Sequence, residues 1–363
     1  GTVQLTTHGS GDATVVNDAG LNFAASTVGG NLAATTDANN GLINLGTLAV
    51  DGTVQLTTNG SGNATVVNDA GLTFAASTVG GNLAATATTG NMTDSGALTI
   101  AGTSSFTTSA NNAQITLDTT TNAFTGAVSL NTTGSGGHAT IDGGTTALDI
   151  AATSVGGQLH LRSGHASGIT DSGTVTVGTW LSATTDANNG VINLNQLAVS
   201  ADIYFTTHGT GNATGVNAST FHFGANNSGM TVGGNLSVTS TTGDITDGWG
   251  NATHTVTGTT TLTTSANNRT ITLDNTNNAF TGAVTITTND NSGTDADVII
   301  DSGTTALVLA ASTIDGDLTV RSGNASGITD RGTVTVGGNL AATTDARSGV
   351  INLGTLAVDG TVA

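Results

Sequence analysis

Internal repetition constrains this chain more than any other feature of its sequence. The segment from Gly1 to Thr35 recurs almost unchanged from Gly52 to Thr86. A longer unit also repeats, because the segment that begins SANNAQITLD at Ser109 returns as SANNRTITLD at Ser265. Repetition of this kind is typical of solenoids, in which each unit packs against its neighbours.

The repeats divide at turn-forming residues into modules of about 25 residues, which gives about 14 modules in the chain. Each module holds three short runs of alternating apolar and polar residues, such as the run around Val54 and Leu56, bounded by Gly, Asn or Asp. Alternation with a period of two and many β-branched residues indicates strands. The pattern predicts an all-β fold, a right-handed parallel β-helix with three strands per coil. A β-sandwich is the alternative, since it too has many evenly spaced short strands.

The composition agrees with strands stacked along one axis. The chain has 363 residues, 53 of them Gly, and neither Pro nor Cys. A Pro inside a central strand would delete a donor from the ladder of hydrogen bonds, so its absence favours continuous ladders. Without Cys, disulfide frameworks, zinc fingers and thiol nucleophiles are excluded.

Charge and hydropathy exclude further classes. The chain carries 24 acidic and five basic residues, for a formal net charge of −19. Nucleic-acid binding needs clustered Lys and Arg, so we expect no nucleic-acid partner. No apolar stretch reaches the length of about 18 residues that a membrane span requires, so we expect no membrane insertion.

The two ends of the sequence match its interior. The chain opens with Gly1, Thr2 and Val3 and closes with a segment that contains Gly360, Thr361 and Val362, and both triplets repeat the segment that starts at Gly52. Solenoids that exist as separate molecules carry polar caps, and we recognise none here. The expectation is one continuous rod over residues 1–363 without caps, whose copies associate end to end through these terminal residues.

Several strings resemble a known family. VGGNLAATT (Val28 to Thr36), GDITD (Gly243 to Asp247), NAFTGAV (Asn122 to Val128) and SGITDSGTVTV (Ser167 to Val177) look like the repeats of giant secreted bacterial exoproteins of the filamentous-haemagglutinin type. The resemblance implies a β-helical shaft on the bacterial surface or outside the cell. The secretion domain of such exoproteins has no counterpart in this sequence.

Parallel β-helices also host enzymes that act on polysaccharides, which need clustered carboxylates and often Arg. The best candidate is the coil with His160, Arg162, His165 and Asp171. Its repeat keeps Arg321 and Asp330 but has Thr319 and Asn324 where the histidines stand, which indicates surface drift and no enzyme. We expect no catalytic residues, and polysaccharide chemistry is the third interpretation, behind a fibre and an adhesin.

Calcium is the only cofactor that the sequence suggests, and weakly. The segment from Asn289 to Asp297 holds a three-residue insertion relative to the earlier repeat and concentrates Asp290, Asp295 and Asp297. Its spacing matches neither an EF-hand nor the calcium-binding nonapeptide repeat. Asp and Asn also cap turns through their own side chains, so the simplest expectation is no cofactor.

Two aromatic residues break the pattern of the outer surface. Trp180 and Tyr204 each precede an inward-facing residue and should therefore point outward, in successive coils. We expect them to be neighbours on one outer face and to make a lateral or glycan contact. The sequence thus favours a structural extracellular fibre for surface coating, attachment or biofilm matrix, partnered chiefly by itself, with a glycan-binding adhesin stalk as the alternative.

Overall fold

The computed structural model describes residues 1–224, 229–248, 252–289 and 295–363. The chain divides into two compact units, Gly1–Thr179 and Trp180–Ala363, here called unit 1 and unit 2. The fold is all-β, a parallel β-solenoid of about 15 coils that follow one another about every 22 residues. This confirms the predicted fold class, with coils slightly shorter and more numerous than the modules of the sequence. The described residues include no helix, and so none long and apolar enough to cross a membrane.

Each coil contributes one unbroken strand, here called the long strand, and one strand that is usually divided into two short pieces, here called the short pair. The long strands of unit 1 are β1 (Ala13–Asn17), β4 (Leu32–Asn39), β6 (Thr53–Asn59), β7 (Ala64–Asn68), β10 (Leu83–Ala87), β13 (Ser104–Asn111), β16 (Val128–Thr133), β17 (Ala139–Asp142) and β20 (Leu159–Ser163). Its short pairs are β2 (Leu21–Asn22) and β3 (Ser26–Val28), β8 (Leu72–Phe74) and β9 (Ser77–Val79), β11 (Met92–Asp94) and β12 (Leu98–Ile100), β14 (Ile115–Leu117) and β15 (Ala123–Phe124), β18 (Leu148–Ile150) and β19 (Thr153–Val155), and β21 (Ile169–Asp171) and β22 (Val175–Val177), while β5 (Ile43–Val50) runs through both positions. The predicted three strands per coil are therefore one long strand and one short pair.

Unit 2 repeats this organisation. Its long strands are β23 (Leu181–Asn188), β25 (Asp202–His208), β26 (Ala213–Asn217), β29 (Leu236–Ser240), β32 (Thr260–Thr264), β35 (Val284–Thr287), β36 (Val298–Asp301), β39 (Leu318–Ser322) and β42 (Leu340–Thr344). Its short pairs are β27 (Phe221–Phe223) and β28 (Thr231–Val232), β30 (Ile245–Thr246) and β31 (Thr255–Val256), β33 (Ile271–Leu273) and β34 (Ala279–Phe280), β37 (Leu307–Leu309) and β38 (Ser312–Ile314), β40 (Ile328–Asp330) and β41 (Val334–Val336), and β43 (Ile351–Asn352) and β44 (Leu356–Val358), with β24 (Ile192–Val199) continuous.

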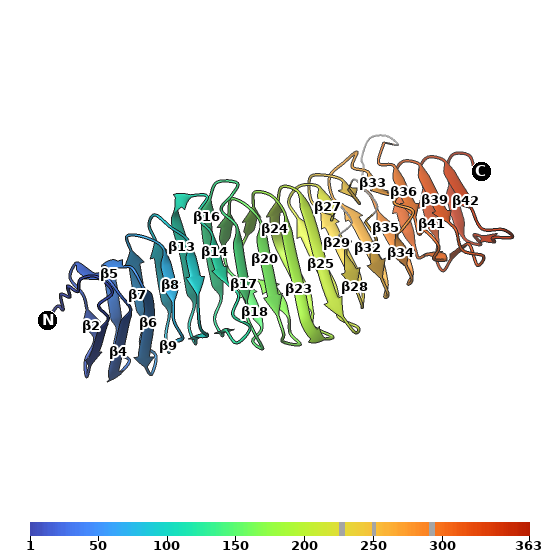
Figure 1. Cartoon of the computed structure of the whole chain (residues 1–363). Helices are drawn as coiled ribbons and strands as arrows, with labels where there is room; N and C mark the ends of the chain where they lie inside the picture. The colour runs from blue at the N-terminus through green and yellow to red at the C-terminus, as the bar shows by residue number, and fades with distance from the viewer. Residues whose placement is uncertain (225–228, 249–251, 290–294) are drawn as a thin grey trace. The chain divides into compact units, whose positions relative to one another are not determined.

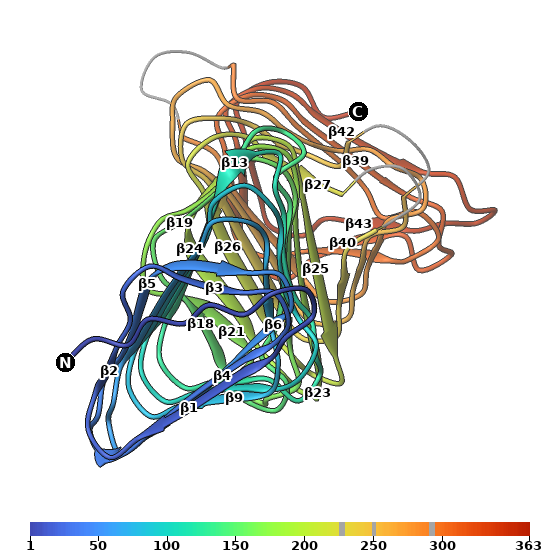
Figure 2. The same ribbon diagram turned by 60° about the vertical axis from the view of Figure 1, so that its left-hand side comes forward.

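Strands pair with the equivalent strands of the next coil, and the pairs described within each unit are parallel. In unit 1, β1 pairs with β4 and β4 with β6, so that Leu32 lies beside Val54. Figure 1 shows these strands following one another along the unit, and Figure 2 shows β1 and β4 on one wall and β3 and β5 on another. Like residues therefore stack on like, as the near-identical repeats require.

The long strand changes walls at intervals within each unit. Two long strands follow each other directly at β6–β7, β16–β17, β25–β26 and β35–β36, and from there the short pairs stack on the wall that carried long strands before. The first three of these crossings turn at a Gly with positive φ, namely Gly60 (62°), Gly134 (79°) and Gly209 (64°). Residues with a Cβ rarely adopt this conformation, which explains the Gly that ends the TT-x-G strings at Gly60 and Gly209. The three-residue insertion predicted between Asn289 and Asp297 lies largely outside the described residues.

A buried Thr holds each of these crossings together. The Thr58 hydroxyl donates to the Gly62 carbonyl at 2.8 Å and accepts from the Gly80 amide of the next coil at 2.9 Å. Thr207 makes the same two contacts with Gly211 and Gly233. The second Thr of the LTT strings is thus an internal clamp that satisfies backbone groups of two coils.

A second polar ladder runs along the corner that precedes the long strands. Asp12 Oδ1 accepts from the Asn31 amide at 2.7 Å, and Asn31 Oδ1 accepts from the Thr53 amide at 2.8 Å. In unit 2 the corresponding ladder runs from Asp317 to Asn339 to Thr361, at 2.6 and 2.9 Å. Much of the Asp and Asn content of the chain is therefore engaged in holding one coil to the next.

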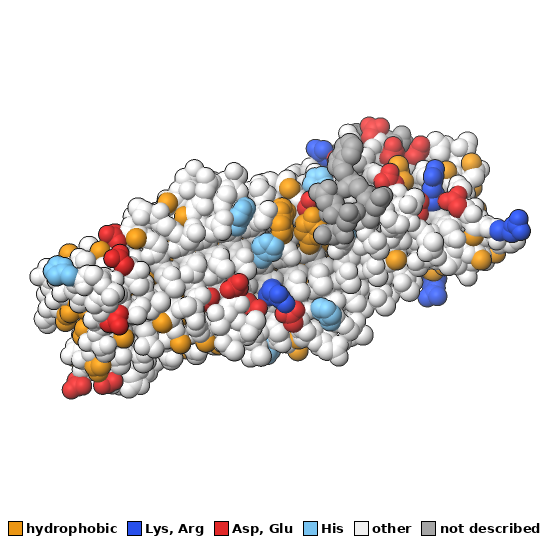
Figure 3. Space-filling model, in the orientation of Figure 1, with side chains coloured by type: hydrophobic (Ala, Val, Ile, Leu, Met, Phe, Trp, Pro, Cys, Tyr) orange, Lys and Arg blue, Asp and Glu red, His pale blue; other side chains and the backbone are white. Residues whose placement is uncertain are grey.

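The core is a continuous column of aliphatic and aromatic side chains inside each unit. Phe74, Phe124 and Phe280, predicted to be core residues, are at most 1% exposed. In unit 1 the rings of Phe74, Phe106 and Phe124 follow one another in edge-to-face contacts of 6.4 and 5.9 Å. The outer surface is mostly uncharged and polar, with few charged side chains on the face seen in Figure 3.

Candidate functional site

The two aromatic residues singled out in the sequence lie together in unit 2. Trp180 directly precedes β23 and Tyr204 lies in β25, and their ring centroids are 5.6 Å apart with the ring planes at 77°. Leu181 pairs with Ile203 and both are buried, so the alternation of the strands turns the flanking aromatic side chains outward. Both residues are partly exposed. Their functional contact remains a prediction.

Polar groups and a glycine surround this aromatic pair. The Tyr204 hydroxyl donates to Asp202 Oδ2 at 3.3 Å, and Asp202 pairs in register with His222. The Tyr204 ring lies over Gly224, where a Cβ would overlap the ring, so only glycine permits this position of the ring. His222 Nδ1 is 2.6 Å from the Thr246 hydroxyl in the following coil. An aromatic surface bordered by a carboxylate and an imidazole suits a ligand with both C–H faces and hydroxyl groups.

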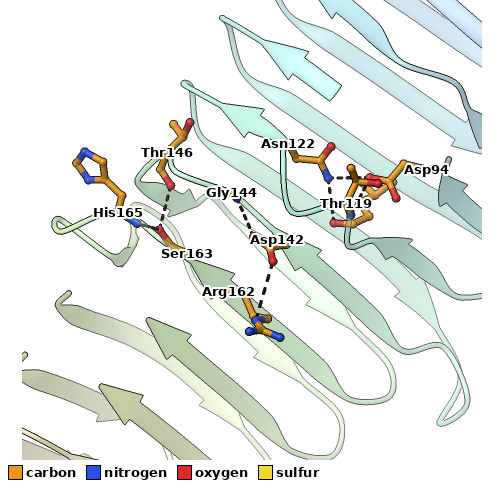
Figure 4. A network of polar contacts seen from close by, with 10 residues as sticks. Asp94, Thr119, Asn122, Asp142, Gly144, Thr146, Arg162, Ser163 and His165 are labelled. Atoms are coloured by element: carbon orange, nitrogen blue, oxygen red, sulfur yellow. Dashed lines mark hydrogen bonds and ion pairs between the residues drawn. The ribbon is translucent and has the colours of Figure 1, made fainter. Parts of the chain in front are cut away.

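A network of polar contacts lies on unit 1 near the residues that the sequence offered as an enzyme site (Figure 4). Arg162 Nε lies 3.9 Å from Asp142 Oδ2, and Asp142 is 7% exposed while Arg162 is 52% exposed. Asp142 Oδ1 accepts from the Gly144 amide at 2.7 Å. His160 pairs in register with Thr140, two residues before this ion pair along each strand. Burial lowers the pKa of the His160 imidazole, with a further contribution from His138.

His165 caps a turn. Its Nδ1 accepts from the Ser167 amide at 3.0 Å, and its ring points away from the other residues drawn in Figure 4. In the later repeat, Asn324 Oδ1 accepts from the Ser326 amide at 2.9 Å. Because Asn performs the same local task, the exchange of His for Asn between the repeats has a structural explanation.

Asp171 lies apart from this group. It ends β21, which stacks on β18 in one sheet, whereas His160 and Arg162 lie in β20, which stacks on β17 in the other. Its counterpart Asp330 accepts the amides of Gly354 and Thr355 at 2.8 and 2.7 Å. The structure therefore brings His160 and Arg162 to one face but places Asp171 in the other sheet.

Carboxyls that are partly or fully buried recur at equivalent places in the two units, at Asp94 and Asp247. Asp94 Oδ2 accepts from Asn122 Nδ2 at 2.7 Å, and Asp247 Oδ2 accepts from Asn278 Nδ2 at 2.9 Å. Burial raises the pKa of both carboxyls, against these hydrogen bonds, which lower it. Each pair joins strands of successive coils, and the repetition of the motif indicates a structural task.

One histidine is buried in the core of unit 2. His254 is 0% exposed, its ring meets Phe223 edge to face at 5.4 Å, and its Nδ1 accepts from the Met230 amide at 3.1 Å. Burial lowers the pKa of His254 to about 4, against a smaller raising effect of the Asp247 backbone. The imidazole is therefore neutral at pH 7 and serves as an internal acceptor.

The calcium candidates are only partly described. Asp290 lies outside the described residues, Asp295 is exposed, and Asp297 Oδ1 accepts from the Asp317 amide at 2.8 Å as part of the corner ladder. Across the described ranges, no three His, Asp, Glu or Cys residues gather in a way that could hold a metal ion.

The predicted junction residues lie in the outermost coils of the described chain. Val3 forms an isolated parallel bridge with Phe23, and Val362 forms one with Leu340. The Thr361 amide is held by Asn339 as the Thr53 amide is held by Asn31. These coils thus use the same contacts as coils in the interior.

Sequence reasoning missed Asp142, the acidic partner of Arg162. The signal was present in the strings IDGGTTAL from Ile141 and IDSGTTAL from Ile300, in which a buried Asp two residues before a positive-φ Gly returns in the later repeat. Buried carboxylates need a partner, so such an Asp should have been examined with the Arg of the next coil.

Comparison with known proteins identifies a family. A family model described as repeats of unknown function (DUF5649) matches residues 61–131, 210–287 and 295–363, together more than half of the chain. The protein is a repeat β-solenoid, and the chain belongs to this DUF5649 repeat family. Neither the curated proteins nor the solved structures include a match to it.

Proposed function

We propose that this chain is a structural segment of a bacterial extracellular fibre, which extends, coats or attaches and catalyses no reaction. The observation that carries the proposal is the use of polar residues for cohesion between coils. Asp297 and Asp330, which the sequence offered for metal binding or chemistry, accept backbone amides of the next coil. His165 instead caps a turn within its own coil. Parallel ladders and internal clamps of this kind resist extension along the axis of a solenoid.

The likeness of VGGNLAATT and NAFTGAV to filamentous-haemagglutinin-type exoproteins supports the finer proposal of a secreted shaft. The periodic ladder supports self-association, because the Thr361 coil docks onto Asn339 by the contacts that hold Thr53 to Asn31. A coil from a second copy would continue the parallel pairing of backbone groups beyond the Thr361 coil. Copies then add end to end, and acidic flanks keep the fibres apart at low salt.

Electron microscopy combined with light scattering tests this function. The full chain at low ionic strength should give slender particles that lengthen with concentration, and millimolar calcium should bring them together sideways and raise the scattering. Sodium chloride at matched ionic strength is the control and should act more weakly. Compact particles that do not lengthen, with scattering unchanged by calcium, would contradict the proposal.

A second function is supported by the aromatic pair of unit 2, namely glycan binding by the shaft itself. Trp180 and Tyr204 offer an exposed aromatic edge beside the Asp202 carboxylate. Oligosaccharides immobilised on a surface should retain the protein, and Trp180→Ala should weaken retention more than Tyr204→Phe, which keeps the ring. Equal retention of the parent and Trp180→Ala would exclude this site.

A further inference from the structure

A pocket of about 200 Å³ opens on the outer face of unit 2. Its lining consists of Asp274, Thr276, Ile299, Asp301, Thr319 and Arg321. Leu273 pairs with Ile300, and Asp301 pairs with Arg321, so the residues Asp274, Asp301 and Arg321 form one column across three successive coils. The pocket lies over the neighbouring strands β33, β36 and β39.

Unit 1 contains the same column of residues, but there the arginine and the second aspartate form an ion pair. Asp118, Asp142 and Arg162 occupy the equivalent places, and Arg162 closes on Asp142 at 3.9 Å. In unit 2, no such ion pair joins Asp301 and Arg321 within the described part of the chain. Burial raises the pKa of the Asp301 carboxyl, and the hydrogen bond from Gly303 and the charge of Arg321 offset only part of this effect. The carboxylate and the guanidinium instead face a common space.

Two residue exchanges, two positions before Asp301 and Arg321 on the same strands, account for the pocket in unit 2. Thr140 and His160 of unit 1 correspond to Ile299 and Thr319 of unit 2, and both of the latter line the pocket. Thr319 has a much smaller side chain than His160. The pocket therefore occupies room that an imidazole fills in the other repeat, and Ile299 gives it an apolar wall.

The Asp301 carboxylate has one oxygen, Oδ2, that no group in the described part of the chain engages. Asp301 is 6% exposed, and its Oδ1 accepts from the Gly303 amide at 2.7 Å. Oδ2, the oxygen that meets the arginine in the case of Asp142, takes part in no hydrogen bond or ion pair among the described residues. Because Asp301 lines the pocket, a donor that enters the pocket can reach this oxygen and complete its hydrogen bonding.

The lining defines the chemistry of that ligand. Carboxylates only accept hydrogen bonds and a guanidinium only donates them, whereas Thr hydroxyls do both. A polyhydroxylated ring satisfies all of them at once, because each hydroxyl donates and accepts, and it brings no charge that must be desolvated. Its C–H face matches Ile299. We propose that this pocket binds one hexopyranose unit of a neutral saccharide, held between Asp301 and Arg321.

Isothermal titration calorimetry of the full chain with methyl hexopyranosides of the gluco, galacto and manno series tests the proposal. A ligand of this size in a small polar pocket should bind with a Kd on the order of millimolar, and the binding that Thr319→His removes should amount to one site per chain. Glycine and calcium chloride are parallel titrants, since a zwitterion or a cation could also pair with these charges. Saturable binding of glycine or calcium with none of the glycosides would overturn the saccharide assignment.

Matched variants locate the site. Thr319→His restores the imidazole of the other repeat and should weaken binding at least tenfold. Asp301→Asn keeps Oδ1 for Gly303 but replaces Oδ2 by a donor, and should have a similar effect. The double variant Thr140→Ile/His160→Thr should open the equivalent pocket in unit 1 and raise the stoichiometry by one.

Circular dichroism spectra equal to those of the parent establish that these variants fold. Binding that survives both Thr319→His and Asp301→Asn unchanged would overturn the assignment to this pocket, as would the lack of any saturable heat. The proposal does not rest on the structural function, because Thr319→His should leave particle length and calcium-induced scattering as they are in the parent. The two proposals can therefore fail separately.

Discussion

His254 should make the stability of unit 2 depend on pH in a way that one substitution removes. Its pKa falls from 6.5 to about 4 on burial, so the folded state favours the neutral imidazole. The stabilising contribution is complete above pH 6.5, is lost as the pH falls from 6.5 to about 4, and changes no further below that. At 1.36 kcal/mol per pH unit, the loss amounts to about 3 kcal/mol.

The matched variant is His254→Asn, because Asn122 in unit 1 already performs the same task by accepting the Leu98 amide of the preceding coil at 2.7 Å. Urea unfolding followed by circular dichroism, at several pH values between 7.5 and 4, gives the free energy of unfolding of both proteins. The raised pKa values of Asp94, Asp247 and Asp301 act in the opposite direction, favouring the folded state as the pH falls, but both proteins share them.

The difference between the two curves therefore isolates His254. The parent should lose about 3 kcal/mol more than the variant between pH 6.5 and 4. NMR titration of the His254 ring gives the folded pKa directly as a control. Parallel pH profiles, or a folded pKa near 6.5, would refute the reasoning.

Three further substitutions test the packing. Gly60→Ala should destabilise unit 1 by more than the cost of about 1–2 kcal/mol for positive φ, because a Cβ at Gly60 would also meet Asn39 and Asn40, and thermal unfolding of unit 1 measures the loss. Asn68→Ala removes a buried amide that exchanges two hydrogen bonds with the Val50 backbone, and should cost about 2–4 kcal/mol in urea titrations; a loss under about 1 kcal/mol would show that water replaces the amide. Phe221→Ala should cost about 3–5 kcal/mol and speed amide exchange in β25 and β27 first, since its ring contacts Phe205 and Phe223, whereas uniform exchange throughout unit 2 would contradict local packing.

The repeat pattern was sufficient to predict the parallel solenoid because stacking of equivalent residues leaves one consistent arrangement. Alternation placed Phe74 and Phe124 inside and Trp180 and Tyr204 outside, as a period of two requires. The coil length was less accurate, because turn signals mark the boundaries of the repeats and the crossings at Gly60 and its equivalents do not divide the chain into equal coils. The change of the long strand from one wall to the other is set by which strands pair across coils, and the local sequence pattern carries no information about that pairing.

The polar sites were harder to predict. Asp142 and Arg162 lie 20 positions apart in the sequence and become neighbours only through the register of β17 on β20. The pocket in unit 2 depends on a missing imidazole at Thr319 and on how Arg321 is directed, neither of which a single sequence reveals. Conversely, Asp171 was grouped with Arg162 by proximity in the chain, although the intervening corner carries it into the other sheet.

The corner ladder has a direction. Asp12 presents its oxygen to the amide of Asn31, and Asn31 presents its own to Thr53, so each acceptor belongs to the earlier coil and each donor to the later one. A polypeptide that emerges amino terminus first would thus always leave behind a finished template for the segment still to arrive. The coils can therefore fold one after another from the amino terminus, because each new coil pairs only with the coil before it.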